Sequence, residues 1–310
     1  MVALGISDSD APTVTEPHWD GLGIDRARVV VPFDVALATD PAGTRRREEW
    51  EAYRQNAAAK GVGLLVAFEA TSSSERVAPD PDTYTRALEA FAERYPDIAA
   101  FTPWNEPNNR DTPHYVVSHD AKLAAEYWLR ARATWPESVP VTAGDFAGIP
   151  GDPYVAVYQR HLKRNGARPD LWAIHAHSDL NSFQVHGDRS ARITRDYLKR
   201  LRWRWSDCRI WLTEYGARYR DAQGKIWGDE SQAQTMQFLL GLPQLDKRID
   251  AIYYYNYSNQ CSIPSRCAMA DTGVVSPAPF NGEPPDYDER DRPRAAYKVL
   301  ADRGPVIEPR

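Results

Sequence analysis

The stretch AAFTPWNEP, residues 99–107, contains the pattern from which the fold can be predicted. A short apolar run, AAFTPW, is followed at once by Asn105, Glu106 and Pro107. An apolar run of this length bounded by turn residues is typical of a buried strand. We therefore predict a strand over residues 99–104, with an amide and a carboxylate at its carboxyl end.

Seven other apolar runs follow the same pattern, and together with the first they predict eight strands. They cover residues 2–6, 26–31, 62–68, 140–144, 171–176, 209–215 and 251–257. Several are apolar throughout, which is typical of strands covered on both faces in a parallel sheet. Helical segments lie between them, as at residues 47–61, 82–96 and 120–136. This alternation predicts an α/β fold, a (β/α)8 TIM barrel that forms a single domain over residues 1–310.

Two segments depart from the regular alternation. The connection at residues 7–25 predicts no more than one turn of helix, and residues at about 258–291 predict an extended, ordered loop. This loop contains Cys261 and Cys267, which are close enough in sequence to form a small disulfide. Cys208 precedes an apolar strand and is expected to be an inert buried thiol.

Polar residues close each predicted strand, and in such a barrel the active site lies at the carboxyl ends of the strands. They are Ser7, Asp8, Arg28, Asp34, Glu69, Asn105, Glu106, Asp145, His175, His177, Glu214 and Asn256. Glu106 and Glu214 close the fourth and seventh strands and can face each other across the barrel mouth. Retaining glycoside hydrolysis requires two carboxyl groups about 5–5.5 Å apart, one as proton donor and one as nucleophile. We expect apolar neighbours such as Trp104 to raise the pKa of Glu106.

The stretches WNEP at residues 104–107 and TEYG at residues 213–216 resemble the two signatures of glycoside hydrolase clan A, the retaining (β/α)8 enzymes. Within that clan, the two stretches most resemble those of families 39 and 128. The resemblance implies that Glu106 is the general acid/base and Glu214 the nucleophile. It also implies that Asn105 binds the sugar 2-hydroxyl and that Arg28 supports the nucleophile. Trp104 and Tyr215 would line the −1 subsite.

The sixth strand departs from the clan pattern. Many clan members carry H-x-Y here, with the tyrosine hydroxyl near the nucleophile, whereas this chain has His175, Ala176 and His177. Either His177 or another residue such as Tyr255 takes the role of that tyrosine. Tyr255 and Trp227 are also candidate sugar platforms. The H-x-H pattern leaves a metal-dependent hydrolase as an alternative, but its strand differs from that of the zinc amidohydrolases, so we expect no metal and no cofactor.

The composition excludes some classes of partner. The net charge is −5, with 38 basic and 43 acidic residues mixed along the chain, so no basic stripe predicts nucleic-acid binding. No apolar run reaches the roughly 18 residues needed to cross a membrane. The 10 Trp and 16 Tyr residues favour a carbohydrate partner, because the apolar faces of sugars stack on aromatic rings. The sequence gives no expectation for the oligomeric state.

We therefore predict a retaining glycoside hydrolase, endo-acting on a β-linked polysaccharide such as a β-glucan. An exo-acting glycosidase and a catalytically silent barrel that binds glycan are the alternatives. A polysaccharide substrate and a loop disulfide would favour an exported protein, although the first residues, MVALGISDSD, lack the pattern of a signal peptide.

Overall fold

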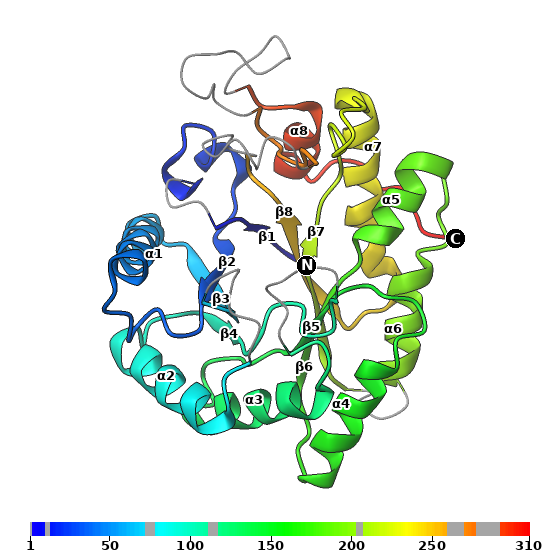
Figure 1. The fold of residues 1–310 in the computed structure, drawn as a ribbon. Helices are drawn as coiled ribbons and strands as arrows, with labels where there is room; N and C mark the ends of the chain where they lie inside the picture. Colours follow the sequence, from blue (N-terminus) through cyan, green and yellow to red (C-terminus); the bar gives the residue numbers. More distant parts are fainter. Residues whose placement is uncertain are drawn as a thin grey trace.

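The structure is a computed structural model of the chain (Figure 1). It describes residues 2–9, 13–71, 78–110, 117–202, 207–258, 270–276 and 292–310. The predicted bridge between Cys261 and Cys267 and most of the loop at 258–291 lie outside the described residues. Cys208 is buried and unbridged, as predicted.

Within the described residues, eight parallel strands form the barrel and confirm the predicted fold class. They are β1 (Ala3–Ser7), β2 (Arg26–Pro32), β3 (Gly63–Glu69), β4 (Ala100–Thr102), β5 (Ala143–Phe146), β6 (Leu171–His175), β7 (Arg209–Tyr215) and β8 (Ile249–Tyr255). Their order in the sheet is β4-β3-β2-β1-β8-β7-β6-β5. A parallel bridge between Phe101 and Val141 joins the segments at β4 and β5, so the barrel is nearly closed.

Helices surround the strands, as Figure 1 shows. They are α1 (Pro41–Ala59), α2 (Pro81–Arg94), α3 (Ala121–Thr134), α4 (Pro153–Arg164), α5 (His177–His186), α6 (Arg192–Arg202), α7 (Gly228–Gly241) and α8 (Ala295–Ala301). In the described part of the connection from β1 to β2, the helical structure is limited to the short 3₁₀ turns Thr13–Thr15 and Asp20–Leu22, as predicted. None of the helices in the described ranges is long and apolar enough to cross a membrane.

Several boundaries differ from prediction by a few residues, and α1 begins at Pro41 rather than at residue 47. Helix α2 begins at Pro81, one residue earlier than expected, because the side chain of Asp80 caps the N–H groups of Asp82 and Thr83. Strand β5 runs to Phe146 rather than ending at residue 144, since a register shift lies between Gly144 and Phe146. Helix α5 was not predicted, and it makes His177 a helix residue rather than a strand residue.

The interior of the barrel is apolar toward the amino ends of the strands, here called the lower end, and polar toward their carboxyl ends. The lower cluster consists of Leu65, Ala100, Leu171, Trp211, Ala251 and Tyr253. Gly5 makes room for it, because a Cβ at this position would lie 2.5 Å from the ring of Tyr253. Toward the carboxyl ends of the strands, the buried positions carry charged and hydroxyl side chains instead, including Arg28, His175 and Thr213. This polar layer is the floor of the candidate site.

Candidate active site

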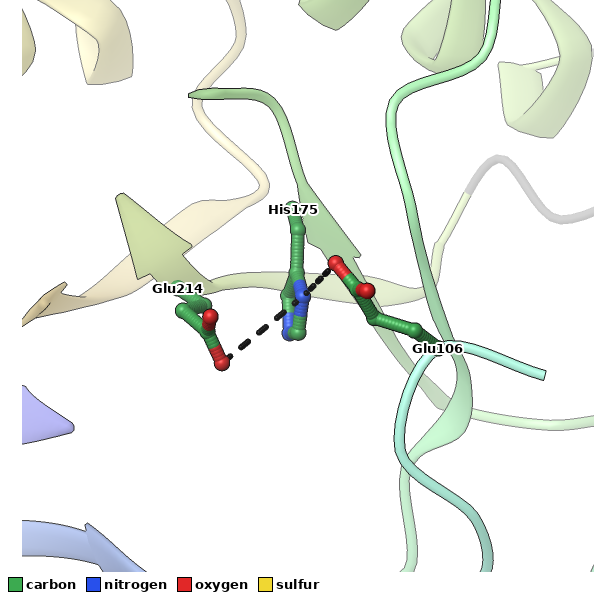
Figure 2. A group of neighbouring side chains, drawn as sticks. All are labelled: Glu106, His175 and Glu214. Carbon is green, nitrogen blue, oxygen red and sulfur yellow. Dashed lines mark hydrogen bonds and ion pairs between the residues drawn. The ribbon is translucent and has the colours of Figure 1, made fainter. Parts of the chain in front are cut away.

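The carboxylates of Glu106 and Glu214 lie at the carboxyl ends of β4 and β7, and Figure 2 shows both turned toward His175. One oxygen of each carboxylate and one ring nitrogen of His175 lie within 4.8 Å of one another. Such a spacing is close to the separation of about 5–5.5 Å in retaining glycosidases and well below the roughly 6.5–9.5 Å of inverting ones.

The two glutamates are linked by a continuous chain of opposite charges. Arg28 donates to Glu214 Oε2 at 2.9 Å and to Asp145 Oδ2 at 2.6 Å. His175 Nε2 lies 2.9 Å from Asp145 Oδ1, and Nδ1 lies 2.9 Å from Glu106 Oε1. Because ionised carboxylates only accept hydrogen bonds, both ring nitrogens of His175 must carry a proton, and the ring is a cation.

Burial and charge act in opposite directions on the pKa of Glu214. Burial raises it, but the nearby His175, His177 and Arg28 outweigh this effect and lower the pKa to about 2. Glu214 is therefore ionised across the physiological pH range. The expected contact between Arg28 and Glu214 is present, and an anionic carboxylate is what a nucleophile requires.

The pKa of Glu106 differs from the sequence-based expectation. Burial raises it, but the hydrogen bond and charge of His175 lower it below its ordinary value. Asn109 adds a second hydrogen bond, from Nδ2 to Glu106 Oε2 at 2.8 Å. The apolar neighbours Trp104 and Pro107 do not decide the outcome, because a cation lies directly against the carboxylate.

Unusual backbone conformations place two of these carboxylates. Glu106 has φ +41° and Asp145 has φ +86°, a region that costs non-glycine residues roughly 1–3 kcal/mol. The N–H of Glu106 donates to the carbonyl of Asp145 at 3.0 Å, which ties the two segments together. The register shift in β5 turns Asp145 into the barrel.

The sequence left open whether His177 or Tyr255 lies beside Glu214, and the structure places His177 there. The N–H of Gly216 donates to His177 Nδ1 at 3.3 Å, so the ring hydrogen is on Nε2, which lies 3.4 Å from Glu214 Oε1. His177 is thus a direct neighbour of Glu214. Tyr255 is partly exposed, and its ring lies 6.0 Å from that of His177.

Asn105 is held in one orientation by Arg28. Its Oδ1 accepts from Arg28 Nη2 at 2.6 Å, and because arginine only donates, the assignment of oxygen and nitrogen is unambiguous. The amide nitrogen therefore points away from Arg28. In this orientation the nitrogen can donate to a sugar oxygen, which is the role that the resemblance implies.

Three predicted sugar contacts are placed differently. Trp104 is 2% exposed and packs against Phe33 and Tyr127, and Tyr215 is fully buried with its hydroxyl 3.1 Å from Thr194. Neither ring has an open face, because both point into the layer between strands and helices. His175, also fully buried, contacts carboxylates rather than solvent.

Trp227 is partly exposed and lies just before α7. The Nζ of Lys225 lies 3.6 Å from its ring centroid, and Arg218 lies 5.6 Å away. One face of the ring is therefore occupied by a cation in the free protein. A sugar platform at Trp227 stays a prediction.

Sequence reasoning did not predict the contacts of Asp145 and missed Asn108 and Asn109 altogether. Asp145 was predicted only as a polar residue that closes the fifth strand, yet it is fully buried between Arg28 and His175. Asn108 exchanges two hydrogen bonds with the backbone of Ala147, at 3.0 and 2.8 Å. Asn109 holds Glu106. The available signal was the repeated asparagine directly after WNEP.

The group of Glu106, His175 and Glu214 fits a metal ion poorly. Glu106, His175 and Glu214 are spaced as a metal site requires. However, a metal ligand must present a lone pair, and both nitrogens of His175 carry protons bound to carboxylates. The nearby carboxylates of Asp145 and Glu214 outweigh burial and raise the pKa of His175 to about 10, and Arg28 places a further positive charge 2.9 Å from Glu214.

Comparisons of sequence find no relative: no protein-family profile matches the chain, and no curated protein matches it. Comparisons of structure, in contrast, find similar proteins. A family 128 (subgroup I) endo-β-1,3-glucanase from Amycolatopsis mediterranei, in complex with laminarihexaose, superposes with a TM-score of 0.56 at 15% identity, covering 97% of this chain and 99% of that chain. The fold is the one these enzymes share.

Two other solved structures extend the likeness. A family 39 enzyme from Xanthomonas axonopodis pv. citri has a TM-score of 0.62 at 14% identity over 97% of this chain and 65% of that chain. Xylanase 10B from Thermotoga maritima has a TM-score of 0.63 at 9% identity over 97% and 95%. The resemblance to clan A glycoside hydrolases is thus confirmed at the level of the fold.

Proposed function

We propose that the protein is a retaining glycoside hydrolase with Glu214 as nucleophile and Glu106 as general acid/base. The observation that carries the proposal is the short separation of these two carboxylates at the mouth of the barrel. Their contacts differ: Glu214 is held ionised by Arg28 and His177, while Glu106 is bound by His175 and Asn109 and takes up its transferable proton at acidic pH.

The reaction follows a double displacement. A carboxylate oxygen of Glu214 forms a bond to the anomeric carbon as the glycosidic C–O bond breaks, and Glu106 gives its proton to the leaving oxygen. Water then attacks the same carbon, its proton passes to Glu106, and the ester bond to Glu214 breaks. Two inversions give net retention, and both carboxyl groups return to their starting protonation.

Asn105, in the segment after β4, supports this chemistry. Arg28 directs the amide nitrogen of Asn105 away from itself, so the nitrogen can donate to the sugar 2-hydroxyl beside the nucleophile. A hydrogen bond to this hydroxyl that strengthens in the transition state stabilises the oxocarbenium-like species.

We propose a β-linked glucan as substrate, with β-1,3-glucan first and endo action expected. Three similar structures are complexes of the family 128 endo-β-1,3-glucanase with laminari-oligosaccharides, and each matches nearly the whole of both chains. Xylanases are also among the similar structures, so xylan is the second polysaccharide to test.

The experiment combines a substrate panel with labelling. Laminarin, mixed-linkage β-glucan, xylan and aryl β-glycosides are incubated with wild-type protein and with Glu214→Gln, and the products are analysed for size and anomeric configuration. We expect retained products from wild type and none from the variant. A 2-deoxy-2-fluoro glycoside should label Glu214, as located by peptide mass spectrometry.

The outcomes separate the alternatives. Release of single sugars from chain ends would favour an exo-acting glycosidase. Binding of polysaccharide without any hydrolysis at high protein concentration would favour the glycan-binding barrel. An inverted product, or a label on another residue, would refute the nucleophile assignment.

A further inference from the structure

The five side chains that join Glu214 to Glu106 alternate in charge, and Asp145 lies at their centre. Reading from one end, they are Glu214, Arg28, Asp145, His175 and Glu106, with successive contacts of 2.9, 2.6, 2.9 and 2.9 Å. Three anions and two cations leave one net negative charge. The five members come from five elements or their ends: β7, β2, β5, β6 and the segment after β4.

Asp145 is placed where it cannot touch a substrate. Its side chain has no exposed area. Oδ2 accepts from Arg28, and Oδ1 accepts from His175 and from the hydroxyl of Thr213. Both carboxylate oxygens are therefore hydrogen-bonded inside the protein. Arg28 and the charged His175 outweigh burial and hold the pKa of Asp145 well below its ordinary value, so it is an anion at every working pH.

We propose that Asp145 is a positioning residue that keeps His175 charged and thereby sets the pH range in which Glu106 can donate a proton. The proposal rests on the acid/base role assigned to Glu106 above. The carboxylate of Asp145 reaches that of Glu106 through His175, because Glu106 Oε1 accepts from His175 Nδ1 and the other ring nitrogen is held by Asp145.

The physical argument concerns the charge on His175. A buried imidazole loses its proton unless anions compensate for the lost hydration, and Asp145 is the anion in direct contact with Nε2. The imidazolium in turn favours the ionised form of Glu106, which then takes up its transferable proton only at acidic pH. The other charged groups that face His175 are Glu214 at 3.9 Å from Nδ1, with Arg28 and His177 bound to Glu214.

The direct test is a titration in which Asp145→Asn is compared with wild type. The substitution keeps the shape but removes the charge, and its amide can donate to Nε2 only if that nitrogen is deprotonated. Imidazole ¹⁵N and carboxyl ¹³C NMR follow His175 and Glu106. We expect His175 to become neutral at pH 7 in the variant and the midpoint for Glu106 to rise by about 1–3 pH units. An unchanged Glu106 midpoint would overturn the proposal, whatever the substrate proves to be.

The kinetic test uses two leaving groups on the same sugar. With phenyl β-laminaribioside, which needs protonation, the alkaline limb of kcat/KM should move to higher pH in Asp145→Asn. With the 2,4-dinitrophenyl glycoside, which leaves without a proton, the same variant should show no such shift. Equal losses with both leaving groups and an unshifted limb would mean that Asp145 is merely structural.

A double-mutant cycle tests whether Asp145 acts through His175. His175→Asn should shift the Glu106 midpoint by as much as Asp145→Asn, and the double variant should shift it no further. Additive shifts would refute the chain of contacts. If Asp145→Asn does not fold, Thr213→Val removes a single hydrogen bond to Asp145 and should give a smaller shift in the same direction.

The control is His186→Gln, an exposed histidine at the end of α5, which should leave both midpoints unchanged. Wild-type turnover on the panel tests the proposed function separately. If wild type hydrolyses no glycoside, the function fails while the NMR titration still decides the role of Asp145.

Discussion

Glu106 is held at both oxygens in the free protein, and this determines how it can act. Oε1 faces His175 and Oε2 accepts from Asn109. A proton on Oε2 would face the nitrogen of Asn109, which is itself a donor, so Asn109 must turn away before the acid can form. Asn109 is partly exposed, and a substrate oxygen entering the site would compete for Glu106 at this position.

The variant Glu106→Gln should lose activity in proportion to the need for protonation. We expect kcat/KM to fall about 10²–10⁴-fold for phenyl β-laminaribioside, since the amide cannot supply a proton. The fall for the 2,4-dinitrophenyl glycoside should be within a few-fold. Steady-state kinetics on the two glycosides measures the ratio.

A matched control is Glu126→Gln on α3, whose carboxylate contacts His161 at the surface. It should leave both kinetic constants near the wild-type values. A similar loss for both leaving groups in Glu106→Gln would contradict the general-acid role.

At the scale of elements, the segment after β4 is fastened to the segment after β5. Asn108 is buried, donates to the carbonyl of Ala147 and to Asp152 Oδ2, and accepts from the N–H of Ala147. Together with the contact from Glu106 N–H to Asp145, these bonds fix the strained backbone that carries the proposed acid.

Asn108→Ala should therefore affect both stability and catalysis. It leaves the N–H of Ala147 without its partner and removes a donor to Asp152, at a cost of about 1–3 kcal/mol in the free energy of unfolding. Displacement of Glu106 should lower kcat/KM roughly 10–100-fold. Urea unfolding and steady-state kinetics measure the two effects.

Asn165→Ala is the comparison, because Asn165 donates to a helix carbonyl at an exposed position. It should change the free energy of unfolding by less than about 0.5 kcal/mol. Equal effects of the two substitutions would show that Asn108 does not fasten the segments.

The strands and both glutamates could be predicted from sequence because their signals are local. An apolar run ending in a polar residue is sufficient to place Glu106 and Glu214 at one end of a parallel barrel. The pKa of Glu106 could not be predicted in this way. It depends on His175, which is 69 positions distant, and on Asp145, whose direction is set by a register shift in β5.

The burial of Trp104 and Tyr215 was missed for a related reason. Successive side chains along a strand point alternately into the barrel and toward the helix layer, and one irregular position reverses this alternation for the residues that follow. The irregularity between Leu212 and Tyr215 in β7 is of this kind. Helix α5 was missed because its sequence, HSDLNSFQVH, has little apolar periodicity.

For the whole molecule, a buried network that carries net charge makes stability depend on pH. The pKa of Glu214 is lowered from 4.5 to about 2, because His175 and the other cations outweigh the effect of burial. Its contribution to stability is present above pH 4.5 and is lost as the pH falls toward 2. The pKa of His175 is raised from 6.5 to about 10, because Asp145 and Glu214 outweigh burial, so its contribution is present below pH 6.5 and is lost as the pH rises through 10.

We therefore expect the free energy of unfolding to be highest between about pH 4.5 and 6.5. It should decline on each side, each group adding a slope of up to about 1.4 kcal/mol per pH unit. Urea titrations across pH 3–10 measure the curve. Glu214→Gln should flatten the acid side and His175→Asn the alkaline side, even if both variants are less stable at the maximum. Slopes that neither variant changes would show that the network does not govern the stability of the barrel.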